Sequence, residues 1–116
     1  MTLISSISGI RGTIGGKISE NLTPVDIVNF ASAFGTWLSF RSGSNKRVVI
    51  GRDARPSGEM VKGLVSQTLV GLGFEVIDLG LSTTPTVEVA VPDLKAAGGI
   101  ILTASHNPVN WNALKL

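Results

Sequence analysis

The stretch Arg47-Val48-Val49-Ile50-Gly51-Arg52-Asp53 decides the fold. Its apolar residues follow one another without alternating with polar ones, which is typical of a strand buried on both faces of a sheet. Residues 99–103 repeat this pattern near the other end of the chain, and residues 74–79 are predicted as a further strand between the two. The sequence therefore predicts a central sheet that other elements cover on both sides.

Helical patterns separate these strands. Thr23-Pro24 begins a helix, because threonine caps a helix end, proline fits the first helical position, and Asp26 completes the spacing of a capping box. A second helix ends at Gly73, and a short third helix runs from Thr84 until Pro92 ends it. Strands that alternate with helices are joined by right-handed crossovers. We therefore predict an α/β domain with a largely parallel or mixed sheet and helices on both faces.

The composition excludes several classes of protein. The chain has 116 residues, 43% hydrophobic and 16% charged, which suits one well-buried domain and not a disordered chain. It has no cysteine and one histidine, which excludes disulfides, thiolate catalysis and zinc sites built from cysteines or several histidines. A net charge of +2 without a basic stripe, and only 5% aromatic residues, argue against nucleic-acid binding. Without a signal-peptide pattern or a membrane-length apolar run, we expect a cytoplasmic protein with no membrane contact.

The strongest local signal is Ala104-Ser105-His106-Asn107-Pro108, which directly follows the strand predicted at 99–103. Ligands of open α/β sheets bind beyond the carboxyl ends of the strands, so this segment stands where function is expected. A reactive serine needs a base, or must already carry the group that it transfers. His106 adjoins Ser105, and neighbours on an extended chain point to opposite sides, which disfavours a hydrolase triad. The alternative interpretation is a loop serine with a local turn hydrogen bond.

A second polar segment, Arg52-Asp53-Ala54-Arg55, follows the strand at 47–51. Arginine offers a planar fork of donors that matches phosphate oxygens, so Arg52 and Arg55 are candidate phosphate ligands. The alternative is a surface cluster in which Asp53 pairs with the arginines.

Two further basic residues are candidates. Arg11 stands between glycines in Ser8-Gly9-Ile10-Arg11-Gly12, and glycines permit close approach of the backbone to an anion or a neighbouring loop. An ordinary turn is the alternative. Lys115 follows Ser105 by ten residues, and a lysine beside a phosphorylated serine could stabilise charge or move a proton. An exposed lysine on a strand is the alternative there.

Together, and in this order, four segments resemble the α-D-phosphohexomutase superfamily. The resemblance covers essentially the whole chain, and the serine segment is its most specific part. It implies that residues 1–116 are the amino-terminal, phosphoserine-bearing domain of a four-domain enzyme, that the remaining domains are its partners, and that the chain alone is inactive. The matching segments are residues 8–12, 51–55, 103–108 and 112–115.

The resemblance also implies a reaction. Ser105 would carry a phosphoryl group and exchange it with a hexose phosphate, so that the 6-phosphate and the 1-phosphate interconvert through a hexose 1,6-bisphosphate, which is also the activator. Mg²⁺ would bind through the phosphate on Ser105, with aspartate ligands beyond this chain. Such phosphoryl transfer depends chiefly on positioning and charge neutralisation, so a phosphoserine needs no triad.

By the same resemblance, Arg11 and Lys115 lie near the phosphoserine and serve acid–base or charge-stabilising roles, and His106 shapes the serine loop. Ala113 stands where the family usually has glycine, and if that position needs a positive φ, alanine should cost about 1 kcal/mol. The residues implied to support the loop are Arg52, Asp53, Arg55 and Asn107.

Residues 78–85 and 111–115 look most like bacterial phosphoglucosamine mutases, which makes glucosamine phosphate the expected substrate. Phosphomannomutase/phosphoglucomutase activity is the alternative within the family. Two alternatives come from other classes: a non-catalytic module that binds phosphosugars, and a structural domain that self-associates through its apolar surface. A homodimer also stays open.

Overall fold

The computed structural model of the chain describes residues 4–6, 9–14, 16–18, 21–54, 57–102 and 111–115. Within these ranges, no helix combines the length and the apolar character needed to cross a membrane. In chain order the elements are β1 (Ile4–Ser6), β2 (Gly9–Thr13), α1 (Pro24–Ser42), β3 (Arg47–Arg52), α2 (Gly58–Gly71), β4 (Glu75–Leu81), α3 (Thr84–Asp93), β5 (Gly98–Leu102) and β6 (Trp111–Lys115).

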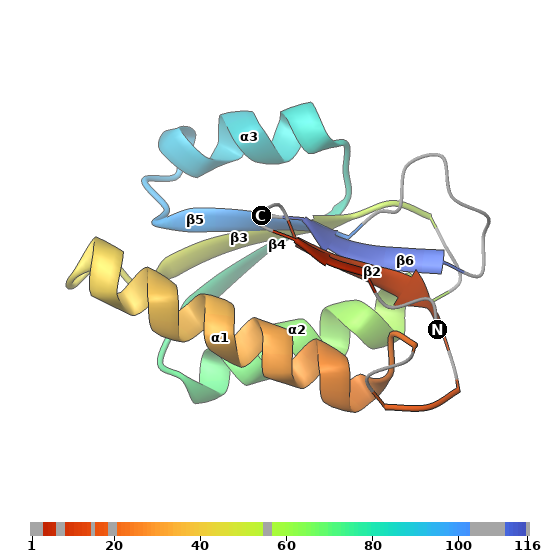
Figure 1. The fold of residues 1–116 in the computed structure, drawn as a ribbon. Helices are drawn as coiled ribbons and strands as arrows, with labels where there is room; N and C mark the ends of the chain where they lie inside the picture. The colour runs from red at the N-terminus through yellow and green to blue at the C-terminus, as the bar shows by residue number, and fades with distance from the viewer. Residues whose placement is uncertain are drawn as a thin grey trace.

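The strands form one mixed sheet in the order β1-β2-β6-β5-β3-β4. β3 is parallel to both of its neighbours, β4 and β5. On the other side, β6 is antiparallel to β5 and to β2, and β2 is antiparallel to β1. α1 and α2 cover one face of the sheet and α3 covers the other (Figure 1). The predicted α/β fold, with a mixed sheet and helices on both faces, is confirmed.

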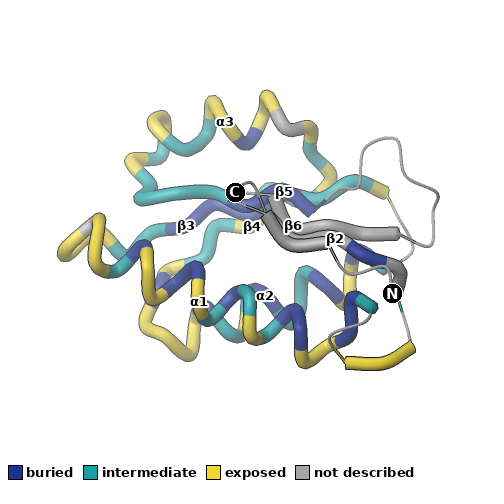
Figure 2. Tube along the Cα trace, viewed as in Figure 1, coloured by how far each residue is buried: buried dark blue, intermediate teal, exposed yellow. Residues whose placement is uncertain are grey.

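β3 contributes to the core on both faces of the sheet. Val48 and Ile50 belong to the larger core cluster with α1 and α2, whereas Val49 belongs to the smaller cluster under α3. All three are fully buried, because side chains alternate across a strand and both faces are covered. Figure 2 shows the buried parts of α1 and α2 facing the sheet. The helices fill the larger cluster with Ile27, Ala31, Phe34, Leu38, Val61, Val65 and Leu69.

Two glycines let α3 lie close to the sheet. A Cβ atom at Gly51 of β3 would lie 2.8 Å from Cγ2 of Val87, and one at Gly99 of β5 would lie 2.9 Å from Cγ2 of Val91. Such distances are too short for carbon atoms, and valine, with one stiff torsion, has little freedom to move away. α3 therefore packs on the sheet at positions where only glycine fits.

The predicted start of α1 and the predicted end of α2 are confirmed. Thr23 and Asp26 form the capping box at the start of α1. After α2, the N–H of Phe74 donates to the carbonyl of Leu69 at 3.0 Å, across Gly73 with its φ of 93°. This bond is typical of a Schellman motif, in which a left-handed glycine ends the helix and the residue after it packs back on the core.

The predicted end of α3 at Pro92 is wrong. Pro92 lies inside the last turn of the helix, which runs to Asp93. The chain leaves the helix through Lys95, at a φ of 54°, where the Lys95 N–H donates to the Pro92 carbonyl at 3.1 Å and the Ala96 N–H donates to the Val91 carbonyl at 2.8 Å. One of these closing bonds uses the carbonyl of Pro92 and the other uses that of Val91. Neither needs the N–H that proline lacks, so proline is tolerated in the final turn.

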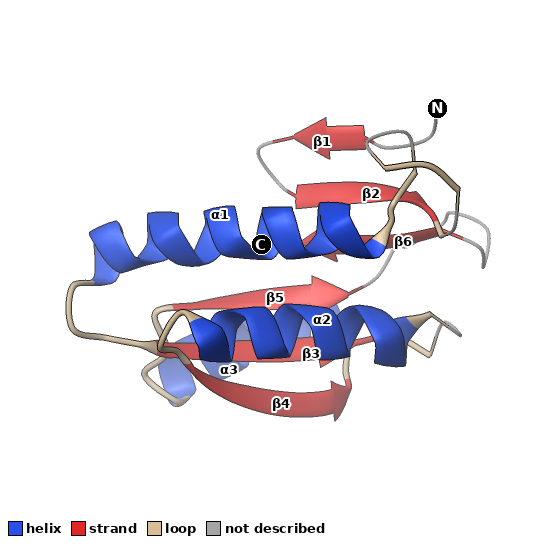
Figure 3. Cartoon of the chain, turned by 90° about the horizontal axis from the view of Figure 1, so that it is seen from below, coloured by secondary structure: helices blue, strands red, loops and turns tan. Residues whose placement is uncertain are grey.

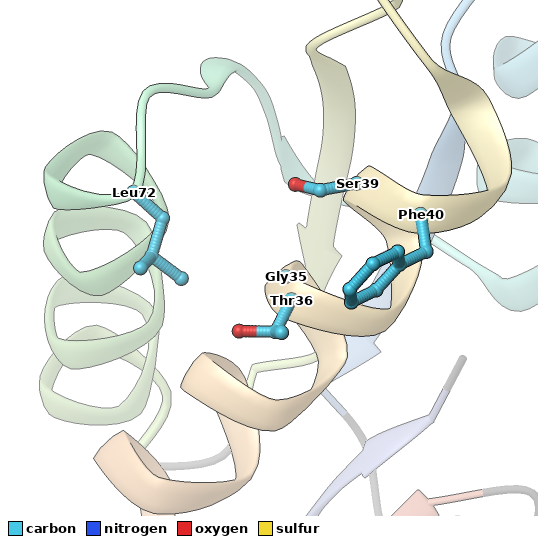
Figure 4. Close-up of a pocket in the computed structure, with 5 residues that line it drawn as sticks. All are labelled: Gly35, Thr36, Ser39, Phe40 and Leu72. Carbon is cyan, nitrogen blue, oxygen red and sulfur yellow. The ribbon is translucent and has the colours of Figure 1, made fainter.

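The C-terminal half of α1 carries exposed aromatic residues. Phe40 is 87% exposed, and Trp37 is 52% exposed with the Arg41 guanidinium 5.2 Å from the centre of its ring. An apolar hollow beside them lies between α1 and the end of α2 (Figure 4). Because both helices end just before the amino ends of strands, this hollow lies at the amino edge of the sheet. Its lining residues are Gly35, Thr36, Ser39, Phe40 and Leu72.

Replacement of Gly99 by alanine should destabilise the chain by about 1–3 kcal/mol, the usual cost of forcing a methyl group into a packed core. The new Cβ would press on Val91 at 2.9 Å. Gly63 of α2 is the matched control, because no described atom lies within 4 Å of its Cβ position. Gly63→Ala should instead stabilise the helix by about 0.5–1 kcal/mol. Urea unfolding followed by circular dichroism measures both, and equal effects would contradict the close approach of α3.

Candidate active site

The carboxyl ends of the three parallel strands are bonded together along one edge of the sheet, which we call the carboxyl edge. The N–H of Asp53, just after β3, donates to the carbonyl of Leu102, the last residue of β5, at 3.1 Å. The N–H of Ser82, just after β4, donates to the carbonyl of Arg52 at 2.9 Å. These two bonds continue the ladder on both sides of β3, so the three strand ends are held in a fixed relation.

Arg11 and Lys115 reach this edge through the register of the antiparallel strands. Lys115 of β6 pairs with Ile101 near the end of β5. Since the two strands are antiparallel, the earlier residues of β6 continue past the end of β5. Arg11 of β2 pairs with one of them, Ala113. By this register, the backbones of Arg11 and Lys115 lie near the end of β5, from which the chain enters the serine segment. Figure 3 shows β2, β6 and β5 following one another across the sheet.

Four of the predicted site residues lie outside the described residues. Ser105, His106 and Asn107 fall within residues 103–110, and Arg55 falls within residues 55–56. Leu102, the residue bonded to Asp53, is the last one described before the serine segment. The roles expected of these four residues stay predictions.

Ala113 occupies an ordinary strand position. It pairs with Arg11 within the continuous register of β2 and β6. Among the described residues other than glycine, Lys95 alone has a positive φ. The condition that would make alanine costly at position 113, a left-handed backbone, is therefore not met. Alanine suits this place, because glycine in the interior of a strand weakens it.

The side chain of Arg52 is engaged by the chain itself. Its Nη2 donates to Oε1 of Glu59 at 2.7 Å, and its Nη1 donates to the carbonyl of Asp53 at 3.2 Å. The side chain is only 17% exposed, and its Cδ and Nη1 lie 3.1 Å from the Cβ position of Gly58. The guanidinium thus closes the loop after β3 against the first turn of α2. This arrangement fits a brace better than a ligand for phosphate.

The pair extends into a network of four charges that links three elements. Lys62 of α2 lies 3.4 Å from Oε1 of Glu59 and 2.9 Å from Oδ2 of Asp78 on β4. The sign of the charge alternates from Arg52 to Glu59, Lys62 and Asp78. Sequence reasoning missed the last three. The spacing of Glu59 and Lys62 is typical of a surface pair on a helix and was a usable signal. No local pattern connects either of them to Asp78.

The network changes the pKa of three of its members. Hydrogen bonding by Lys62, with the charges of Lys62 and Arg52, lowers the pKa of Glu59. The hydrogen bond with Asp78 raises the pKa of Lys62, against a smaller opposite effect of burial. Burial by itself raises the pKa of Asp78, but hydrogen bonds from Lys62 and from the N–H of Gly80 outweigh it and the pKa is lowered. These directions keep Glu59, Lys62 and Asp78 charged at neutral pH.

The carboxylates at the carboxyl edge do not fit a metal ion. Glu59 and Asp78 each bind Lys62, so a cation would have to displace its ammonium group. In the part of the chain that the structure describes, no group of three or more His, Cys, Asp or Glu residues could hold a metal ion.

Known proteins resemble the whole chain. One family model, described as phosphoglucomutase/phosphomannomutase, alpha/beta/alpha domain I, matches residues 4–116. A phosphoglucomutase/phosphomannomutase of Thermococcus kodakarensis is 41% identical over 107 residues, which cover 90% of this chain and 24% of that protein. A phosphoglucosamine/phosphogalactosamine mutase of Sulfurisphaera tokodaii is 36% identical over 108 residues, which cover 93% and 22%. A crystal structure of a Thermus thermophilus protein matches with a TM-score of 0.83 and 35% identity, over 99% of this chain and 26% of that one. The chain spans about a quarter of the length of these proteins.

Replacement of Lys62 by glutamine should lower the free energy of unfolding near neutral pH. In acid, where Glu59 and Asp78 become protonated, the replacement should no longer change it. The folded-state pKa values of Glu59 and Asp78 lie below the ordinary 4.5 and 3.8. Their stabilising contribution is therefore complete above those ordinary values, and it is lost as the pH falls through the lower folded-state values. Urea unfolding between about pH 7 and about pH 2 spans this window.

Lys17, an exposed lysine outside the network, provides the control. Lys17→Gln should change the free energy of unfolding little at either pH, because single surface charges contribute little. An effect of Lys62→Gln that stays the same across the pH range would mean that the network does not stabilise the fold.

Proposed function

Because the chain belongs to the phosphoglucomutase/phosphomannomutase family, whose alpha/beta/alpha domain I it matches over residues 4–116, we propose that it is the phosphoserine-bearing first domain of a phosphohexomutase. The relatives of which it covers 24% and 22% support further domains as its partners. Four domains in all, a cytoplasmic location and inactivity of the chain alone belong to the same proposal.

The convergence of basic residues on the carboxyl edge carries this proposal. The chain enters the serine segment from β5, with the ladder of β2 and β6 on one side and β3 on the other. That ladder holds Arg11 and Lys115, and β3 ends in Arg52. A transferring phosphoryl group carries negative charge and needs positioning and neutralisation above all. Arg11 and Lys115, on the ladder at one side of this strand end, suit that need, whereas Arg52 on the other side is paired with Glu59 and holds the loop.

In the proposed reaction, Ser105 begins as a phosphoserine. A hydroxyl oxygen of the hexose monophosphate bonds to phosphorus as the bond from phosphorus to the serine Oγ breaks. A base takes the hydroxyl proton, and the released Oγ takes up a proton to become the serine hydroxyl. The product is a hexose 1,6-bisphosphate. After this intermediate turns over in the site, its other phosphoryl group returns to the Oγ, and the phosphate has moved between positions 6 and 1. The bisphosphate also restores the phosphoserine when it is lost, and in that sense is the activator.

Arg11 and Lys115 are proposed to stabilise charge and to hold and move the proton. Lys115 stands on β6, next to β5, and Arg11 stands on β2, paired with the part of β6 that continues past the end of β5, so the register supports such a role. His106 is proposed to shape the serine loop. The residues proposed to support the loop are Arg52, Asp53, Arg55 and Asn107, and the bonds of Arg52 to Glu59 and to the Asp53 carbonyl agree with this.

Mg²⁺ is the proposed cofactor, bound through the phosphate of Ser105 and by carboxylates beyond this chain. When bound, it would neutralise charge on the transferring phosphate. Glu59 and Asp78 do not contribute to that site, because Lys62 already occupies both.

Glucosamine phosphate is the proposed substrate, and mannose or glucose phosphate is the alternative. The relatives carry names from both groups of substrates. The phosphoglucomutase/phosphomannomutase is 41% identical to this chain, and the phosphoglucosamine/phosphogalactosamine mutase is 36% identical. The alternative of a non-catalytic module that binds phosphosugars is less well supported. It needs Arg52 as a phosphate ligand, and Arg52 already donates to Glu59 and to the Asp53 carbonyl.

Ser105→Ala in the full-length enzyme should lower kcat by about 10³ or more, since it removes the group that is exchanged. Mass spectrometry of the active enzyme should find phosphate on Ser105. Ser44→Ala, in the exposed turn after α1, is the control and should keep full activity. Unchanged turnover in Ser105→Ala would overturn the mechanism. Saturable binding of hexose phosphate without any turnover in the native protein would favour the binding module.

The substrate is decided by comparing kcat/KM of the full-length enzyme for glucosamine 6-phosphate and mannose 6-phosphate. We expect a preference for the amino sugar of about tenfold or more, the size that one well-placed polar contact gives. Equal rates, or a preference for mannose 6-phosphate, would move the enzyme to the phosphomannomutase/phosphoglucomutase branch and leave the role of Ser105 intact.

A further inference from the structure

We propose that Glu59 is a positioning residue of the phosphoryl-transfer site, which holds Arg52 so that Arg52 fixes the strand end from which the Ser105 segment leaves. This inference rests on the proposed function of Ser105. Glu59 itself lies on α2 and is not proposed to touch the substrate.

The path from Glu59 to the serine segment consists of three hydrogen bonds. Oε1 of Glu59 accepts from Nη2 of Arg52 at 2.7 Å. Nη1 of the same guanidinium donates to the carbonyl of Asp53 at 3.2 Å. The N–H of Asp53 donates to the carbonyl of Leu102 at 3.1 Å, and the serine segment begins at the next residue. Movement of Arg52 would therefore reach the strand end from which the Ser105 segment leaves through a single residue, Asp53.

Arg52 depends on Glu59 for its orientation. Among the described atoms, its buried Nε has no hydrogen-bond partner. A buried donor without a partner disfavours this placement of the side chain. The hydrogen bonds of Nη1 and Nη2 offset the cost of the unpartnered Nε. Of these two bonds, only the one to the Glu59 carboxylate is to a charged group, and hydrogen bonds to charged groups are the stronger ones. Loss of the Glu59 carboxylate should therefore release the guanidinium from the loop.

The rest of the network makes Glu59 more effective than its surface position suggests. Its side chain is 68% exposed, and an isolated pair at such a place would contribute little. Lys62 lies 3.4 Å from the same Oε1 and is itself held by Asp78 of β4 at 2.9 Å. The carboxylate is thus fixed between two cations that are anchored on different elements of the fold.

The opposite end of β3 offers a matched control within the same strand. Arg47, its first residue, pairs with Glu75 of β4 at 3.5 Å, and the side chain of Glu75 is 61% exposed. Both pairs therefore join an arginine at an end of β3 to an exposed glutamate. Only the pair of Arg52 lies at the carboxyl edge.

The test is steady-state kinetics of the full-length enzyme with glucosamine 6-phosphate and mannose 6-phosphate. Glu59→Ala should lower kcat about tenfold, the order of loss that follows from misplacing a reacting group by a fraction of an ångström, with little change in KM. Glu59→Gln keeps an acceptor oxygen for Nη2 and should recover most of the lost kcat. Glu75→Ala should leave kcat unchanged. Thermal unfolding of each variant identifies any loss that comes from partial unfolding at the assay temperature.

The outcomes separate the two proposals. If Ser105→Ala is inactive and Glu59→Ala matches Glu75→Ala in kcat, Glu59 has no positioning role while the function of Ser105 stands. An equal fall in kcat for Glu59→Ala and Glu59→Gln would also overturn the inference, because the hydrogen bond to Arg52 would then not be what matters. If Ser105→Ala keeps its activity, the proposed function itself fails.

Discussion

The hydrogen-bonded position of β3 between β4 and β5 is the constraint on which the rest of the structure depends. Val48, Val49 and Ile50 are fully buried and serve the core on both faces, so β3 admits no polar side chain along its middle. Its charged residues are consequently confined to the two ends. The carboxyl end of β3 is then fixed by hydrogen bonds on both sides. The Arg52 carbonyl accepts from Ser82, just after β4, and the Asp53 N–H donates to Leu102 at the end of β5. A rigid, apolar strand thus delivers a polar loop to one defined place, where ligands of such sheets bind.

The two arginines at the ends of β3 show how one strand can serve two purposes. Arg47 donates from Nη1 to the carbonyl of Leu94 at 2.7 Å and pairs with Glu75 at 3.5 Å, so it joins the start of β3 to the residue after α3 and to β4. Arg52 is more buried and belongs to a network that reaches α2 and β4. The amino edge also carries the exposed Phe40. The amino edge therefore combines a single ion pair with an exposed aromatic residue, whereas the carboxyl edge holds the network of four charges.

Local chemistry accounts for what the sequence could predict. The capping box of Thr23 and the left-handed Gly73 act within a few residues, and both are confirmed. Pro92 gave a wrong end for α3, because proline usually stops a helix. The bonds that close α3 do not need the N–H that proline lacks. The strand order, the register that brings Arg11 to the end of β5, and the link from Lys62 to Asp78 are set by tertiary packing and leave no local pattern. Motif order could therefore name the candidate residues, and only the fold could show that Arg52 is bonded to Glu59.

The sheet order also makes the site depend on its last strand. Among the described strands, the hairpin of β1 and β2 joins the rest of the sheet through β6 alone, which lies between β2 and β5. A two-stranded hairpin alone is marginal in water, so Arg11 gains a fixed place only when β6 is seated. The serine segment is the connection between β5 and β6, and each of these strands is hydrogen-bonded to the other and to a second neighbour. The strand that carries Lys115 therefore anchors the far end of the segment that carries Ser105, while Asp53, braced by Arg52, anchors the near end at Leu102. Fixed strands at both ends of this segment agree with the proposed reaction, in which Ser105 gives up one phosphoryl group and later receives the other from the bisphosphate.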